Sequence, residues 1–198
     1  NDTPHLKNLG MRKMLEILEL SEHVRSGDLG FRIGPCINAA GRLDDAALGL
    51  KMLTTTDERE VVKLVNELIT LNEERKELTA QATNNAIAQI EEMKALEKPV
   101  LVIYLKDCHE SVAGIVAGRI REKYYRPAYV LTDGEKGLKG PGRSIPGYHM
   151  QQALQNCQEI LTEFGGHALA AGFSLPKENL DKFRDALNEQ CNLTDEEL

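Results

Sequence analysis

The run Val100-Leu101-Val102-Ile103-Tyr104-Leu105 decides the fold class of this chain. It follows Pro99, which ends the preceding helical pattern, and it has the length of a β-strand. Apolar residues fill consecutive positions instead of alternate ones, which is typical of a strand covered on both faces. The run therefore predicts a buried strand in an α/β domain.

Strand and helix patterns alternate along the rest of the chain. Further strands are expected at 128–131, 137–145 and 170–175, and helices at 111–123, 150–163 and 179–190. Asp133-Gly134 predicts a turn between two of these strands. Alternation over residues 98–191 predicts an α/β domain with a small mixed β-sheet flanked by helices.

A long connecting helix is expected before this domain, at 54–97. Apolar residues recur at helical spacing from Val61 to Met93, and the run 54–57 offers capping residues at the start. Residues 57–97 carry ten acidic and five basic side chains, so the other face is acidic and solvated. We interpret this helix as a strut between domains, with a possible break near 81–85.

Residues 1–53 are expected to be the helical end of an upstream lobe. Short helical patterns cover residues 1–30, and this piece is too small to bury a core alone. Because Asn1 is not an initiator methionine, we expect the chain to begin inside a longer protein. Residues 192–198 are expected to form a C-terminal tail.

The composition narrows the functional class. The chain has 198 residues, a formal net charge of −7 and 5% aromatic residues, which argues against an all-basic surface or many base-stacking platforms. No apolar run approaches the length of a membrane span and no signal sequence is present, so we expect a cytoplasmic protein. The four cysteines have no paired metal-ligand spacing, and we expect them to be reduced.

The segment Lys139-Gly140-Pro141-Gly142-Arg143-Ser144 is a candidate phosphate site between the third strand and the next helix. Exposed backbone N–H groups, a guanidinium and a hydroxyl together suit a phosphate oxyanion. Residues 106–143 contain eight basic and five acidic side chains, a local excess of positive charge that is expected where nucleic acid binds. The alternative is a hairpin turn with a solvated Arg143.

The segment Gly165-Gly166-His167-Ala168-Leu169-Ala170-Ala171-Gly172 surrounds one imidazole with small residues. Small residues allow the close approach of a ligand, and His167 is the one side chain there that titrates near neutral pH. A tight turn into a buried strand, with His167 bonded to a backbone carbonyl, is the alternative.

Arg42 closes another stretch of small residues, which begins at Gly34-Pro35. Gly34-Pro35 predicts a turn, and Asn38 and Gly41 favour unusual backbone angles. A guanidinium after such a stretch can reach an anion with little obstruction, or it can pair with a following aspartate. His109 and Glu110 follow the strand at 100–105, but no other metal ligand stands at a recognisable spacing.

Four segments resemble, in order, motifs of the RecJ family of bacterial single-stranded-DNA-specific exonucleases, within the DHH phosphoesterase superfamily. The segments are 34–46, 109–119, 142–144 and 165–172. The resemblance covers nearly the whole chain and identifies it with the C-terminal half of such an enzyme. It implies a long helix that leads to a DHH-associated domain binding the DNA strand. Divalent Mg²⁺ or Mn²⁺ would be held by an Asp-His-His lobe that this chain lacks.

The resemblance also implies a role for individual residues. His167 would support catalysis near the scissile phosphate, and Arg42, Arg143 and Ser144 would hold DNA phosphates. The other residues expected to bind DNA are Asn38, Lys139, Gly142, Gly165 and Gly166, with Arg119 and Arg126 on a secondary basic edge. No metal ligand is expected within this chain.

The chain departs from the family pattern at several positions. Cys36 replaces a frequent Arg, which removes one phosphate contact, and Pro141 replaces a Ser, which removes a hydroxyl and a backbone donor. Cys108 and Ser111 replace a common Trp and Gly, so base stacking is not expected at that place.

The sequence and the resemblance predict the C-terminal part of a metal-dependent exonuclease that degrades single-stranded DNA from its 5′ end in repair and recombination. Expected partners are single-stranded DNA and either a single-stranded-DNA-binding protein or a helicase, and we expect a monomer that is inactive without the metal lobe. Two alternatives stay open. One is a related phosphodiesterase acting on short oligonucleotides or cyclic dinucleotides, and the other is a non-catalytic nucleic-acid-binding module.

Overall fold

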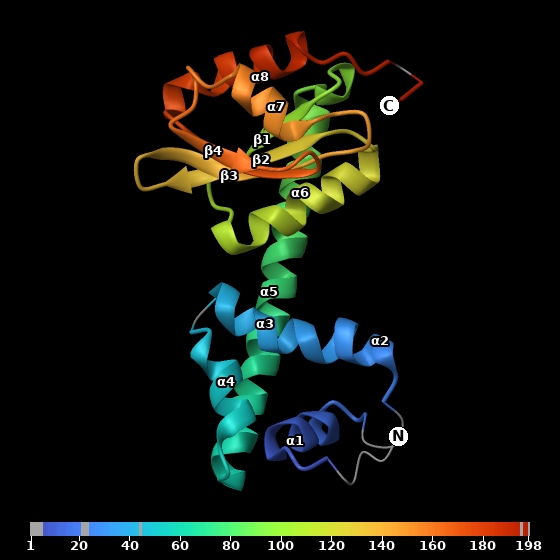
Figure 1. Cartoon of the computed structure of the whole chain (residues 1–198), viewed down its shortest axis with the longest axis vertical. Helices are drawn as coiled ribbons and strands as arrows, with labels where there is room; N and C mark the ends of the chain where they lie inside the picture. The colour runs from blue at the N-terminus through green and yellow to red at the C-terminus, as the bar shows by residue number, and fades with distance from the viewer. Residues whose placement is uncertain (1–5, 21–23, 44, 195, 198) are drawn as a thin grey trace. The chain divides into compact units, whose positions relative to one another are not determined.

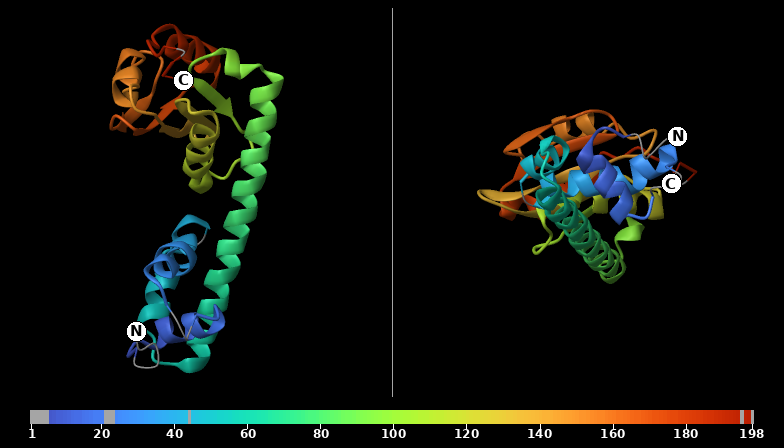
Figure 2. Two further views of the ribbon diagram at one scale, coloured as in Figure 1. Left: turned by 90° about the vertical axis from the view of Figure 1, so that its right-hand side faces the viewer. Right: turned by 90° about the horizontal axis from the view of Figure 1, so that it is seen from below.

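The computed structural model describes residues 6–20, 24–43, 45–194 and 196–197. The predictions of short helices over 1–30 and of a tail at 192–198 therefore lie partly outside the described residues. The chain divides into two compact units, residues 1–77 and 78–198, which are described here one at a time. Figures 1 and 2 show the helical first unit in blue to teal and the mixed second unit in green to red.

The first unit consists of helices. They are α1 (Leu9–Ile17), α2 (Ser26–Asp28), a π-helical turn (Leu29–Ile33), α3 (Gly34–Leu43), α4 (Ala47–Thr54) and the first part of α5 (Glu58–Glu92). Met14, Met52 and Leu68 are fully buried in its core. Asn8 joins two of the helices, because its Oδ1 accepts the N–H of Met11 and its Nδ2 donates to the carbonyl of Leu53.

The turn predicted at Gly34-Pro35 is wrong, since these residues begin α3. The π-helical turn at Leu29–Ile33 runs directly into α3, so the helical backbone continues through both residues. Gly41 lies inside the same helix and is not among the residues with positive φ. Asn38 and Arg42 consequently stand one helical turn apart.

The helix α5 is continuous through the predicted break near 81–85. It begins later than expected, because Asp57 Oδ1 accepts the N–H groups of Arg59 and Glu60 and so caps the first turn. It ends before Lys94, whose φ of 49° is incompatible with a continuing helix. No helix in the described part of the chain is both long and apolar enough to cross a membrane.

The second unit is built around a five-stranded sheet of order β1-β2-β3-β5-β4. The strands are β1 (Leu101–Tyr104), β2 (Ala128–Gly134), β3 (Gly137–Arg143), β4 (Glu163–Gly166) and β5 (Ala170–Leu175). β1 and β2 are parallel, and every other pair is antiparallel. The predicted mixed sheet with flanking helices is thus confirmed.

Helices cover both faces of this sheet. They are the end of α5, a 3₁₀ turn (Ala95–Glu97), α6 (Glu110–Tyr124), α7 (Met150–Asn156), a second 3₁₀ turn (Lys177–Asn179) and α8 (Leu180–Glu189). One core lies between the sheet and α5 with α6, and the other lies between the sheet and α7 with α8 (Figure 1). Alternate residues of β1 enter opposite cores, Leu101 and Ile103 on one side and Val102 on the other. The fully apolar run therefore forms a strand buried on both faces, as predicted.

The helix predicted at 150–163 is too long. α7 ends at Asn156, and a turn follows in which Ile160 and Leu161 pack against the core. Glu163 begins β4, a strand that the sequence pattern did not predict. β4 forms because its backbone pairs with β5, so its position depends on contacts with another strand.

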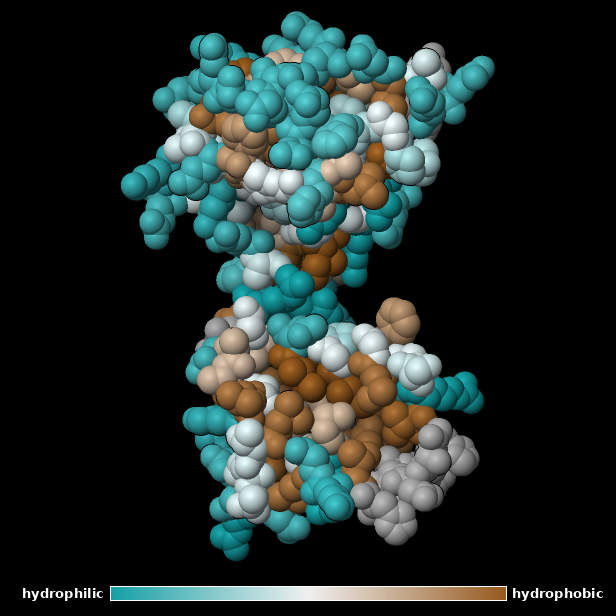
Figure 3. All heavy atoms as spheres, viewed as in Figure 1, coloured by the Kyte–Doolittle hydropathy of each residue, from teal (hydrophilic) through white to brown (hydrophobic). Residues whose placement is uncertain are grey.

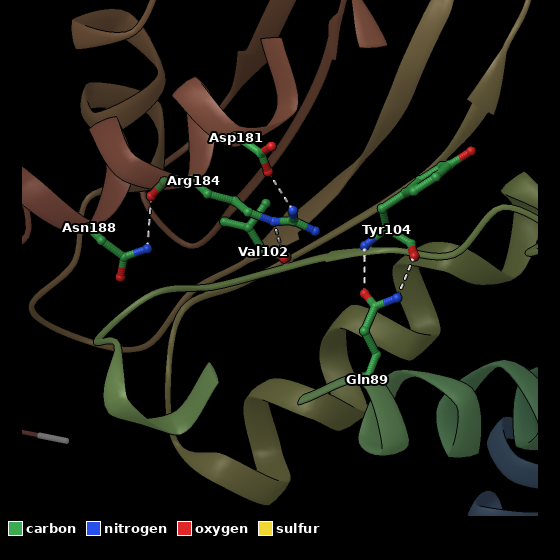
Figure 4. Close-up of polar contacts among 6 residues, drawn as sticks. All are labelled: Gln89, Val102, Tyr104, Asp181, Arg184 and Asn188. Carbon is green, nitrogen blue, oxygen red and sulfur yellow. Dashed lines mark hydrogen bonds and ion pairs between the residues drawn. The ribbon is translucent and has the colours of Figure 1, made fainter. Parts of the chain in front are cut away.

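The free edge of β1 is closed by side chains (Figure 4). The amide of Gln89, from α5, accepts from Tyr104 N at 3.1 Å and donates to Tyr104 O at 3.0 Å. From α8, Arg184 Nε donates to Val102 O and Asn188 Oδ1 accepts from Val100 N. These bonds replace a neighbouring strand and protect the edge from pairing with another chain.

The first unit keeps part of its apolar surface exposed. Figure 3 shows apolar side chains gathered on the viewed face of this unit. In this unit, Phe31 is 86% exposed and Leu50 is 64% exposed. This unit therefore buries only part of its apolar side chains by itself.

Candidate nucleic-acid interface

The second unit has an uncovered area on the sheet face that carries α6. Because side chains alternate along a strand, the residues opposite the α7–α8 core share this face. They are Lys139, Pro141 and Arg143 of β3, Ala170, Gly172 and Ser174 of β5, and Glu163 and Gly165 of β4. A Cβ added at Gly172 or Gly165 would meet no described atom within 4 Å. We call this area, formed by the eight residues above, the open face.

The row at the middle of the open face has little side-chain bulk. Pro141 of β3 is opposite Gly172 of β5, which in turn is opposite Gly165 of β4. Proline is rare in a central strand because it has no N–H for the ladder. The row consequently offers a shallow backbone surface that an extended chain can approach closely.

Residues 139–143 of the candidate phosphate segment lie within strand β3, so the strand expected at 137–145 is confirmed, and the placement of the segment between that strand and the next helix is wrong. Its glycines allow close packing within the fold. A Cβ at Gly140 would lie 1.9 Å from Val130 O, and one at Gly142 would lie 2.5 Å from Met150 Sδ. Gly142 is buried on the side opposite the open face.

Arg143 lies where the open face meets α6. A Cβ added at Gly114 of α6 would be 3.1 Å from Arg143 Nη2, so the guanidinium rests directly on the helix. Its Nη1 donates to the backbone carbonyl of Gly142 at 2.8 Å, and no ion pair joins it to a described carboxylate. Partial burial lowers the pKa of Arg143, and the positive charge of Arg121 lowers it further. An anion bound here would relieve both unfavourable effects.

Lys139 and Ser144 already have partners within the fold. Lys139 Nζ forms an ion pair with Glu110 Oε2 at 2.5 Å. Ser144 is 4% exposed, and its hydroxyl donates to Tyr148 O at 2.8 Å. Its backbone N–H donates to Leu169 O, which joins the end of β3 to the turn between β4 and β5. The geometry therefore gives Ser144 a supporting position beneath the surface.

His167 is exposed in the turn between β4 and β5. The preceding Gly166 has φ of +150°, and a Cβ there would lie 2.5 Å from Ala170 O, so the turn requires glycine. The register places Arg143 opposite Ala170 and Gly166 opposite Ala171. His167 and Arg143 consequently lie at the same end of the sheet.

The other predicted residues are distributed over both units. Asn38 and Arg42 are exposed on α3, in the first unit, at a spacing that puts them on one side of that helix. Arg119 is exposed on α6. Arg126 is less accessible, and its Nη1 donates to the backbone carbonyl of Lys98, which holds the segment before β1.

In the part of the chain that the structure describes, His109 does not form part of a metal site. His109 caps α6, and its Nδ1 lies 2.7 Å from Ser111 Oγ. Within the described residues, no group of three or more His, Cys, Asp or Glu side chains is arranged to hold a metal ion. The described side chains therefore do not fit a divalent metal.

The second unit is similar to a known family of domains. Residues 97–193 match the profile of the DHHA1 domain. This part of the chain is therefore similar to DHHA1 domains. The match includes the whole sheet, α6, α7 and α8, and with them Arg143, His167 and the open face.

Over most of its length the chain is similar to RecJ proteins. It is 36% identical to the single-stranded-DNA-specific exonuclease RecJ of Salmonella typhimurium over 91% of this chain and 33% of that protein. For RecJ of Bacillus subtilis the identity is 34%, over 96% of this chain and 25% of the relative. The chain thus spans about one third or less of these relatives, and the resemblance drawn from the four motifs is confirmed.

Solved RecJ structures share the fold. RecJ of Thermus thermophilus in complex with Mg²⁺ superposes with a TM-score of 0.80 at 30% identity, over 95% of this chain and 29% of that one. An exonuclease RecJ bound to manganese gives a TM-score of 0.85 at 31% identity, over 95% of this chain and 46% of that one. Over the matched residues this chain therefore shares its fold with these RecJ proteins.

Sequence reasoning assigned no individual role to two side chains at this interface, although Arg121 is one of the eight basic residues counted over 106–143. Arg121 is close enough to Arg143 to lower its pKa, and Glu110 neutralises Lys139. The spacing of Gly114, Gly118 and Arg121 along α6 indicates that they lie on one side of the helix, because residues at i, i+4 and i+7 share a helical face. Which strand that face meets could not be derived from spacing alone.

Proposed function

We propose that this chain is the DNA-binding part of a metal-dependent exonuclease that degrades single-stranded DNA from its 5′ end during repair and recombination. The single-stranded-DNA-specific exonucleases that it resembles support this proposal. The observation that carries it is the Arg143 guanidinium, which borders a shallow backbone surface and has no described carboxylate as an ion-pair partner. Such a surface suits a flexible strand with one charged group per nucleotide.

The proposed domain organisation follows the sequence prediction. Residues 1–53 would be the end of the catalytic lobe, 54–97 the connecting helix, 98–191 the DNA-binding domain and 192–198 a tail. The matched DHHA1 range, 97–193, supports the third of these boundaries.

Each candidate residue has a proposed role that its position allows. Arg143 neutralises a phosphate, and Gly165 allows the strand to approach. Lys139 also binds a phosphate, after it releases the carboxylate of Glu110. This exchange is feasible because the Lys139–Glu110 ion pair is partly exposed. Ser144 and Gly142 hold β3 in place.

The other candidate residues would contact DNA from outside the open face, in the β4–β5 turn and on other elements. His167, positioned by Gly166, would supply a hydrogen bond near the scissile phosphate. Asn38 and Arg42 would bind phosphate from α3, while Arg119 and Arg126 add a weaker positive field.

The metals, the partners and the compartment are also proposals. Mg²⁺ or Mn²⁺, as in the RecJ complexes, would be bound by residues outside this chain, which alone would not hydrolyse DNA. We propose that the enzyme acts as a monomer in the cytoplasm, together with a single-stranded-DNA-binding protein or a helicase.

Arg143→Ala tests the role of the open face. Titrating a fluorescent single strand with the 198-residue chain at several salt concentrations gives the slope of log K against log salt. Loss of one phosphate contact should reduce that slope by about 0.7 and weaken binding at low salt. Lys182→Ala is the matched control, since it removes one exposed positive charge from α8, on the other side of the sheet.

Two results would count against the proposal. If Arg143→Ala and Lys182→Ala changed the slope equally, general electrostatics would explain the binding and the open face would have no special part. If the whole enzyme cleaved dinucleotides but not long single strands, the proposed substrate would be wrong, and the phosphodiesterase alternative would replace it.

A further inference from the structure

The helix α6 presents a smooth strip to strand β3. Gly114, Gly118 and Arg121 follow one another at i, i+4 and i+7, so they share one side of the helix. Arg143 Nη2 rests on this side, 3.1 Å from the place where a Cβ of residue 114 would be. Since residue 114 is glycine, the guanidinium can lie flat against the helix. Arg121 stands two turns further along the same strip.

The charges around this strip are unbalanced. The hydrogen bond from Arg143 goes to the neutral carbonyl of Gly142. The nearby positive charge of Arg121 opposes that of Arg143 and lowers the pKa of Arg143. Two guanidinium groups held near each other, one of them without a carboxylate, form a site that an anion stabilises.

Arg121 has one unsatisfied donor. Its Nη2 bonds Glu122 Oε1 at 2.9 Å, in an ion pair whose side chains are 33% and 68% exposed. Its Nε is buried and has no hydrogen-bond partner, and among the described side chains it is the one buried nitrogen or oxygen in this condition. An unsatisfied buried donor is unfavourable, so this conformation suits a state without ligand.

We propose that Arg121 and Arg143 together bind one phosphate group of the DNA strand, and that Arg121 exchanges Glu122 for this phosphate. The inference rests on the proposed function, and it adds Arg121 as a second residue that binds the phosphate. Nε and Nη2 lie on the same edge of the guanidinium, so a rotated Arg121 offers both to one oxyanion. The exchange is feasible because an exposed ion pair contributes little stability.

Arg121→Gln tests this site against Lys123→Gln. Both residues belong to α6 and both changes remove one positive charge, but Lys123 is exposed and stands two positions on, away from the strip. In anisotropy titrations of the 198-residue chain with a fluorescent single strand, Arg121→Gln should weaken binding about tenfold at low salt. Lys123→Gln should weaken it less than about twofold, as expected for a distant screened charge.

A double variant examines whether the two arginines share one phosphate. If they do, Arg121→Gln combined with Arg143→Gln should weaken binding by much less than the product of the single effects. Arg121→Lys should give an intermediate loss, because it retains the charge without the two-donor edge. It also serves as the folded variant if Arg121→Gln lowers the melting temperature.

Two strands, one with a 5′-phosphate and one with a 5′-hydroxyl, identify the source of the phosphate. A terminal phosphate in the site predicts that Arg121→Gln removes the preference for the phosphorylated strand. An internal phosphodiester predicts equal losses for both strands. Either pattern supports the shared site and assigns its ligand.

Inorganic phosphate provides a readout that does not depend on DNA binding. Millimolar phosphate should raise the melting temperature of the wild-type chain and of Lys123→Gln, and raise that of Arg121→Gln much less. Failure of the wild-type chain to bind any single strand would contradict the proposed function. Equal DNA binding by Arg121→Gln and Lys123→Gln, or a phosphate effect that Arg121→Gln leaves unchanged, would overturn the two-arginine site alone.

Discussion

The two faces of strand β5 differ in burial and in side-chain size. Towards α7 and α8 it presents Ala171, Phe173 and Leu175, all of them buried. On the open face it presents Ala170, Gly172 and Ser174, among which Gly172 is exposed. The buried side holds the strand in place, so the other side can lack side-chain bulk and remain accessible. In this domain, one alternation along a strand separates stability from the proposed binding surface.

The largest effect is expected on the buried side. Phe173→Ala removes an edge-to-face contact with Tyr129, with centroids 5.4 Å apart, and a contact with Phe183 at 4.9 Å. Loss of a buried phenyl ring should lower the free energy of unfolding by about 3–5 kcal/mol. Urea unfolding followed by tyrosine fluorescence measures this loss in the second unit, because all five tyrosines lie within residues 104–148.

Leu169→Ala is the control for Phe173→Ala. Leu169 belongs to the same unit but is 54% exposed, so its truncation should change the unfolding free energy by less than about 0.5 kcal/mol. Equal losses for the two variants would mean that Phe173 does not stabilise the domain in the way its burial indicates.

A smaller effect should separate two neighbouring glycines. A Cβ at Gly166 would lie 2.5 Å from both Ala170 O and Ala171 Cα, at a φ of +150°. Gly166→Ala should therefore cost about 1–3 kcal/mol of unfolding free energy. Gly165→Ala should cost little, since its Cβ would meet no described atom within 4 Å. The same urea titration compares them, and equal losses would show that the turn before His167 does not depend on the backbone of Gly166.

Sequence reasoning identified elements whose signal is local. The apolar run at 100–105 forms a strand because its hydrophobicity is continuous, and the segment 170–175 forms one in which Phe173 and Leu175 alternate with smaller residues. β4 was missed because Gly165 and Gly166 have no strand propensity, and only pairing with β5 orders them. At Gly34-Pro35 the turn signal was overridden, since both residues continue the helical backbone of the preceding π-helical turn.

Part of the candidate site could also be predicted from the sequence. Motif resemblance selected Arg143 and His167, and the sheet register places both at one end of the sheet. It did not show that the Ser144 hydroxyl is buried against Tyr148 O, because that contact depends on the chain turning after β3. Nor did it single out Arg121, whose proximity to Arg143 depends on how α6 crosses β3.

A substitution on the open face should have the smallest effect on the free energy of unfolding. It should nevertheless weaken DNA binding. Gly172→Val adds a β-branched side chain at an exposed strand position where even a Cβ meets no described atom within 4 Å. Valine favours strand geometry, so the unfolding free energy should stay within about 0.5 kcal/mol of wild type or rise slightly. DNA binding should nevertheless weaken several-fold, because the added methyl groups stand over the row that joins Pro141 to Gly165. Fluorescence anisotropy measures that binding and urea unfolding measures the stability. Unchanged binding would remove the open face from the DNA path, whereas a loss of stability like that of Phe173→Ala would show that this face is not open.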